Sequence, residues 1–164
     1  MFVGVPAARF RRLVQLDSFS CGSKAVQMIL VHFGVAVRLG HARLKALLGT
    51  NPEKGTAVVP MLTLLRRHLR VGYRTNLSWH ELLKALRKGG VVLVALDGDH
   101  FGVVHAVDHG RVFVADPSLL RCPGRRQTRR RFLARWTRWG LIVSRSRAAA
   151  KATGRRLEKR ARNG

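Results

Sequence analysis

Three consecutive β-strands are predicted over residues 91–115, and they constrain the fold more than any other segment of the chain. Residues 91–96 form an unbroken apolar run, which is typical of a strand buried on both faces. Two further strand-like runs, residues 101–107 and 111–115, are separated by a turn that contains Gly110. A central strand followed by such a hairpin predicts an antiparallel sheet in this half of the chain.

The residues before this sheet are predicted to be mainly helical. Four helices begin near Cys21, His41, Thr56 and Ser78. Thr56 is the expected N-cap of the third helix, and Ser78 with Glu81 forms a capping box at the start of the fourth. A helix around residues 132–136 and a strand at residues 141–144 follow the hairpin. Helices first and an antiparallel sheet second indicate an α+β fold.

Cys21 stands at the start of the first predicted helix, six residues after Gln15. A thiol is a strong nucleophile only as a thiolate, and a helix N-terminus stabilises that anion through its unpaired N–H groups and its dipole. The side-chain amide of Gln15 can point its NH2 group at a developing oxyanion, beside the N–H of Cys21. The alternative is a small cysteine that belongs to the core.

A nucleophilic cysteine needs a base, and the hairpin offers one. In a hairpin that turns at residues 109–110, His100 and Asp116 lie roughly opposite each other. An aspartate there can hold the imidazole in one tautomer and stabilise the imidazolium. Four of the 8 acidic residues lie between residues 97 and 116, which indicates selective placement around this histidine. The histidines in or beside helical segments are interpreted as surface or packing residues; they are His32, His41, His68 and His80.

A metal site is the competing interpretation of the same segment, because His and Asp are ordinary metal ligands. Alternation along a strand places His100 and His105 on opposite faces, and His109 lies in the turn. The sequence has no HExxH helix and no paired CxxC motif. We therefore expect no metal and no other cofactor, and we expect His105 to pack or to donate a single hydrogen bond.

Together these motifs resemble the C39 peptidase family, whose papain-like domains cut leader peptides after a double glycine and are often fused to bacteriocin exporters. The resemblance rests on the Gln15–Cys21 spacing, the Cys-Gly helix, the strand from His100, and Asp116-Pro sixteen residues later. It extends through residues 132–140 and covers about residues 5–144.

The resemblance implies a papain-like fold in which an N-terminal helical half packs on an antiparallel sheet half. It implies that Cys21 is the nucleophile, that His100 is the general base and acid, that Asp116 orients His100, and that Gln15 is the oxyanion-hole donor. The sequence departs from the family's usual pattern at Ser20, Ser23, Lys24 and Gly102. These departures surround the predicted cleft and leave the substrate class open.

The formal net charge of +24 on 164 residues predicts anionic partners. We expect one peptidase domain over residues 1–144 and a basic, disordered tail over residues 145–164. Nonspecific nucleic-acid contact is expected through residues 125–131 and 145–162. Trp136 and Trp139 beside the first of these clusters are interpreted as packing residues rather than as stacking platforms for bases. A GC-rich genome that uses arginine freely on solvated faces is the alternative explanation of the charge.

Neither a signal peptide nor a membrane-spanning segment is predicted, since the longest apolar run covers only residues 91–96. Cys21 and Cys122 do not make a disulfide framework. A catalytic thiol must stay reduced, so we expect a cytoplasmic protein.

Three functions remain open on the sequence. The first is a cysteine endopeptidase that cuts an acidic precursor peptide, with a Gly-Gly leader as the site that the resemblance implies. The second is a papain-like acyltransferase or amidase with the same thiol chemistry. The third is a catalytically silent basic protein that binds nucleic acid, which the presence of all four catalytic residue types argues against.

Overall fold

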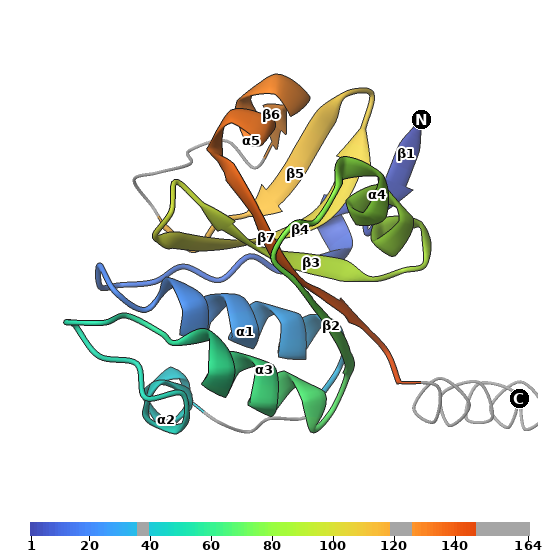
Figure 1. The fold of residues 1–164 in the computed structure, drawn as a ribbon. Helices are drawn as coiled ribbons and strands as arrows, with labels where there is room; N and C mark the ends of the chain where they lie inside the picture. Colours follow the sequence, from blue (N-terminus) through green and yellow to red (C-terminus); the bar gives the residue numbers. More distant parts are fainter. Residues whose placement is uncertain (36–39, 119–125, 147–164) are drawn as a thin grey trace, which may run out of the picture.

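The computed structural model describes residues 1–35, 40–118 and 126–146 (Figure 1). In chain order its elements are β1 (Phe2–Gly4), the 3-10 helix η1 (Ala7–Arg9), α1 (Cys21–His32), α2 (His41–Leu47), α3 (Val58–Arg66), β2 (Arg70–Arg74), α4 (Trp79–Arg87), β3 (Val91–Leu96), β4 (His100–Asp108), β5 (Arg111–Ala115), β6 (Arg126–Thr128), α5 (Arg129–Arg135) and β7 (Trp136–Ser144).

A seven-stranded antiparallel sheet forms the centre of the molecule. Six strands follow the order β2-β7-β3-β4-β5-β6, and β1 pairs with β4 beside this path. The last strand, β7, therefore lies between β2 and β3 rather than at an edge. The predicted α+β fold is confirmed. Among the described residues, no helix has the length and apolar character needed to cross a lipid bilayer.

The two faces of the sheet are covered by different helices. Figure 1 shows α1, α2 and α3 on one face and α4 and α5 on the other. Alternate residues of β3 feed the two cores: Val91 and Leu93 pack with α1–α3, whereas Val92 and Val94 pack with α4 and α5. This double burial explains why β3 is continuously apolar.

Two predicted helix starts have different outcomes. The capping box is confirmed, because Ser78 Oγ accepts from the N–H of Glu81 at 3.2 Å and Glu81 Oε2 accepts from the N–H of Ser78 at 2.9 Å. The prediction that Thr56 caps the next helix is wrong, since α3 begins at Val58 without a side-chain cap. Thr56 Oγ1 instead accepts from the N–H of Ser23 at 3.2 Å, so it serves the first turn of α1.

The hairpin of β4 and β5 contains one extra residue. Near the turn Ala106 lies opposite Phe113, but beyond His105 the partner of Val104 is Val114. A β-bulge of this kind shifts the register by one residue. If this register is extended by one residue beyond the last pair, Val103 and Ala115, Asp116 falls opposite Gly102. Gly102 and His100 are two positions apart in β4 and so share a face. The bulge therefore places His100 and Asp116 on the same face of the hairpin.

His105, at the bulge, bonds to and packs against the N-terminal segment of the chain. Its Nδ1–H donates to the carbonyl of Val5 at 2.9 Å, and its own carbonyl accepts from the N–H of Val5 at 2.7 Å. Its ring stacks on Phe10 with centroids 4.7 Å apart. The single hydrogen bond predicted for the His105 side chain is confirmed.

Candidate active site

Cys21 is the first residue of α1, and its thiol is free and buried. The following Gly22 lets this end of the helix approach its neighbours. A Cβ at Gly22 would lie 2.7 Å from Thr56 Cβ and 3.1 Å from both Met61 Sδ and Phe101 Cδ2. Carbon atoms do not pack that closely, so the glycine after the cysteine is a packing requirement that holds the thiol beside the start of β4.

His100 and Asp116 form a buried pair. His100 Nε2 lies 2.6 Å from Asp116 Oδ1, and both side chains are almost fully shielded from solvent. The N–H of Ser118 donates to the same carboxylate oxygen at 2.8 Å. Arg12 donates to the backbone carbonyls of Asp116 and Ser118 at 2.5 and 2.6 Å, which fixes the chain just after β5.

The other ring nitrogen of His100 is available to Cys21. Burial acts to lower the pKa of His100, but hydrogen bonds to Asp116 and Cys21, together with the negative charge of both groups, outweigh it and raise the pKa to about 9. Since Nε2 faces Asp116, the hydrogen bond to Cys21 falls to Nδ1. The structure thus brings Cys21, His100 and Asp116 together in one buried set, with the imidazole between the thiol and the carboxylate.

Gln15 lies in the segment that leads to α1. Its N–H donates to the carbonyl of Pro117 at 2.9 Å, which joins this segment to the residue after Asp116. Its Nε2 donates to the carbonyl of Asp17 at 2.7 Å, and Oε1 is buried without a partner among the described residues. One N–H of the amide therefore orients the group, and an amide carries a second N–H that this contact does not use.

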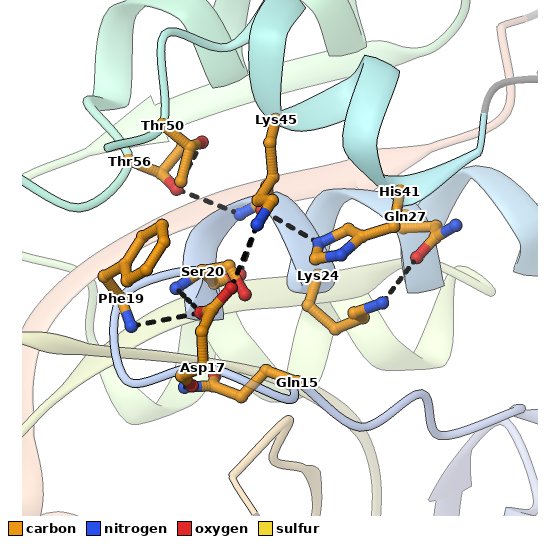
Figure 2. Close-up of polar contacts among 11 residues, drawn as sticks. Gln15, Asp17, Phe19, Ser20, Lys24, Gln27, His41, Lys45, Thr50 and Thr56 are labelled. Atoms are coloured by element: carbon orange, nitrogen blue, oxygen red, sulfur yellow. Dashed lines mark hydrogen bonds and ion pairs between the residues drawn. The ribbon is translucent and has the colours of Figure 1, made fainter. Parts of the chain in front are cut away.

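Asp17 organises the turn between Gln15 and Cys21 (Figure 2). Its Oδ1 accepts from the N–H groups of Phe19 and Ser20 at 3.2 and 2.8 Å, and its Oδ2 pairs with Lys45 Nζ of α2 at 3.0 Å. Burial acts to raise the pKa of Asp17, but hydrogen bonds from Ser20 and Lys45 and these N–H groups lower it to about 2. Sequence reasoning missed Asp17. Its signal is the residue type, because an Asp side chain often accepts from backbone N–H groups two or three residues later and so forms a turn.

A second set of polar contacts ties α1 to α2. Ser23 Oγ donates to the carbonyl of Ser20 at 3.0 Å and accepts from His41 Nε2 at 3.2 Å. Lys24 is buried on α1, and its Nζ donates to Gln27 Oε1 at 3.1 Å (Figure 2). Burial lowers the pKa of Lys24. The unusual Ser23-Lys24 pair therefore belongs to the support of the helix start.

The predicted acidic cluster around His100 divides into separate contacts. Asp116 pairs with His100, whereas Asp97 binds Arg135 at 2.7 Å and Asp108 pairs with His109 at 2.7 Å. In the described part of the chain, no three His, Cys, Asp or Glu side chains are grouped so that they could hold a metal ion. Cys122 lies outside the described residues.

The chain is similar to a known protein family and to several solved structures. The model of the peptidase C39 family matches residues 9–148. No curated protein matches the chain. Among solved structures, a double glycine motif protease from an AMS/PCAT transporter, in complex with the leader peptide, has a TM-score of 0.67 at 18% identity, with 88% of this chain and 99% of that chain covered.

Two further structures show the same fold. The peptidase domain of Streptococcus ComA, a bifunctional ABC transporter, has a TM-score of 0.65 at 17% identity, with 84% of this chain and 99% of that chain covered. A protein from Bacillus anthracis described as a C39-like peptidase has a TM-score of 0.69 at 14% identity, with coverage of 89% and 98%.

Proposed function

The chain belongs to the peptidase C39 family, and from this premise we propose that it is a cysteine endopeptidase with Cys21 as its nucleophile. One observation carries the proposal. The ring of His100 is held by Asp116 at 2.6 Å on one side and hydrogen-bonded to Cys21 on the other, at the N-terminus of α1. A thiol beside an imidazole that is itself oriented by a third group is a typical arrangement for activation of a catalytic cysteine.

In the proposed reaction, the Cys21 thiolate attacks the scissile carbonyl carbon and the C=O π electrons move to oxygen. The N–H of Cys21 and the second N–H of Gln15 Nε2 donate to this oxyanion. His100 Nδ1–H then protonates the leaving amine as the C–N bond breaks, which leaves a thioester on Cys21. Water attacks the thioester while His100 accepts its proton, and the acid product leaves with the thiolate regenerated.

The support around these groups is rigid. Asp116 fixes the tautomer and plane of His100, and the Asp17 turn fixes the amide of Gln15. The position of Cys21 at the N-terminus of α1, where the helix dipole is positive, favours a thiolate. These features lower the reorganisation needed when charge develops on the substrate.

For the substrate, we propose a precursor peptide cut after a double glycine. A structural neighbour is a double glycine motif protease bound to the leader peptide, which supports a peptide in the corresponding place here. The net charge of +24 favours an acidic precursor. The proposed thiol chemistry also requires a reducing compartment such as the cytoplasm.

The test is cleavage of a synthetic acidic leader peptide that contains Gly-Gly, followed by mass spectrometry, with Cys21→Ala and Cys122→Ser as a matched pair. We expect cleavage after the second glycine by the wild type and by Cys122→Ser, and none by Cys21→Ala. Equal cleavage by both variants would overturn the assignment of the nucleophile. Added hydroxylamine that captures the acyl group in place of water would identify acyl transfer as the preferred outcome.

A further inference from the structure

Two adjoining hollows form a groove that the proposed peptidase site does not use. The first, of about 690 Å³, lies between the β1–η1 segment, the end of α1 and the end of β7. The second, of about 370 Å³, lies between β2 and α4 over β7. Arg70, Lys88 and Ser144 line both hollows, so the two form one continuous surface. We call it the cationic groove.

The cationic groove is remote from the catalytic cysteine. His32 and Phe33, at the C-terminal end of α1, line its first hollow, whereas Cys21 begins the same helix. At a rise of 1.5 Å per residue, the two ends of α1 lie about 16 Å apart. A ligand in the groove therefore leaves the peptidase site free.

The charge of the groove is strongly one-sided. Six cationic side chains line it: Arg9, Arg70, Arg74, Lys84, Lys88 and Arg145. Its single acid, Glu81, already accepts from the N–H and hydroxyl of Ser78 and lies 3.9 Å from Arg74. Within the described residues, no other cation of the groove pairs with a carboxylate. These cations repel one another, and a bound polyanion would relieve that repulsion.

The lining of the groove leaves room for a phosphate backbone. Gly72 and Gly89 line it without side chains, which permits close approach of a backbone. Apolar side chains contribute to the lining, but none of the large exposed apolar side chains in the described residues does so. Lys84 and Lys88 are one helical turn apart, about 6 Å, a separation similar to that between neighbouring phosphates of one strand.

We propose that the cationic groove binds the phosphodiester backbone of nucleic acid without reading its sequence. The basic composition of the chain after Arg145 supports this proposal. Arg145 lines the groove, and residues 147–164 beyond contain seven Lys or Arg and one Glu. Residues 125–131, predicted as a nucleic-acid contact, are a weaker candidate, because Arg129 is already stacked over Trp79 at 4.9 Å.

The test uses the full chain and a fluorescently labelled 20-nucleotide single strand, with anisotropy measured over a range of salt concentrations. Arg70→Ala/Lys88→Ala removes two charges from the groove, and Arg43→Ala/Arg66→Ala removes two exposed charges elsewhere. We expect the groove variant to bind at least about tenfold more weakly, with a slope of log K against log salt reduced by about 1.4. The control is expected to stay within about twofold of the wild type.

Equal losses in the groove variant and the control would overturn the proposal. Stronger displacement of the strand by polyglutamate than by unlabelled DNA of equal charge would also overturn it, in favour of an acidic protein partner. Lys84→Ala/Arg145→Ala provides an independent second variant with the same expectation. Peptide cleavage by all these variants should equal that of the wild type, so this test is separate from the test of peptidase function.

Discussion

The two ends of α1 differ in how the charged side chains around them are paired. At the N-terminal end, Asp17 is paired with Lys45 in a partly exposed ion pair. His100 there is bonded to both Asp116 and Cys21, and its contact with Asp116 is shielded from water. At the C-terminal end, the cations of the groove face an open hollow, and the acid among its described lining residues, Glu81, is already engaged. One helix thus separates a closed polar network from an open charged surface.

This difference separates two kinds of function. Paired and buried charges fix atoms to within a fraction of an ångström, which bond-breaking chemistry requires. Unpaired charges on an open surface attract a polyanion over a longer range but impose little geometry. We therefore expect substitutions at the N-terminal end to change the rate of peptide cleavage, and substitutions at the C-terminal end to change salt-dependent binding.

The largest effect is expected from loss of the Asp116 carboxylate. In Asp116→Asn, kcat/KM for the leader peptide should fall by about 10²- to 10⁴-fold, because the imidazole loses its orienting partner. The variant also loses a cause that raises the pKa of His100, so the alkaline limb of the pH–rate profile, near pH 9 in the wild type, should move to lower pH. An unchanged profile would separate Asp116 from His100 in function.

The next largest effect is expected at Gln15. In Gln15→Ala, kcat should fall by about 10²- to 10³-fold with little change in KM, because a donor to the oxyanion acts mainly in the transition state. Single-turnover cleavage of the leader peptide measures this directly. A rise in KM with kcat preserved would instead assign Gln15 to substrate binding.

A smaller effect, on stability, is expected at Gly22. Gly22→Ala should lower the free energy of unfolding by about 1 to 3 kcal/mol, because the new Cβ has no room beside Thr56 and Met61. Gly40→Ala is the matched control, since no atom lies within 4 Å of a Cβ built there. Urea unfolding of both variants checks the prediction, and equal stability would show that the helix start tolerates the added methyl group.

The smallest effect is expected from the Asp17 turn. Asp17→Ala should cost about 1 to 2 kcal/mol at pH 7, as for the loss of a helix-capping side chain. The pKa of Asp17 is lowered to about 2, so its contribution is present above about pH 4 and is lost as the pH falls toward 2.

Urea unfolding at pH 7, 4 and 2.5 should therefore show wild type and Asp17→Ala converging in acid. A double-mutant cycle with Lys45→Ala measures the share that belongs to their ion pair. A stability difference independent of pH would contradict the assigned charge on Asp17.

Local patterns predicted much of the fold and the residues of the candidate site. The apolar run of β3, the hairpin and the capping box at Ser78 follow from residues that are neighbours in sequence. The proximity of His100 and Asp116 was predicted from a simple hairpin, but the pairing depends on the bulge at His105. That bulge is stabilised by Val5, a hundred residues away, so local sequence could not reveal it.

The contacts that hold the start of α1 could not be predicted from neighbouring residues either. Thr56 resembles a cap for α3, yet its hydroxyl accepts from Ser23, 33 positions earlier. His41 resembles a surface residue, yet its ring bonds to Ser23 across two helices. Their partners are set by how α1, α2 and α3 pack, and packing is decided by the whole core rather than by any segment. The predicted basic tail lies outside the described residues from position 147 onward and stays a prediction.

The most direct test of the central claim is an NMR titration of the ring nitrogens of His100, assigned by comparison with His100→Gln. We expect His100 to titrate near pH 9 in the wild type, and we expect its pKa to fall toward the ordinary value near 6.5 in Cys21→Ala and in Asp116→Asn. A wild-type His100 that titrates near 6.5, unaffected by either substitution, would contradict the linkage of Cys21, His100 and Asp116 into one site.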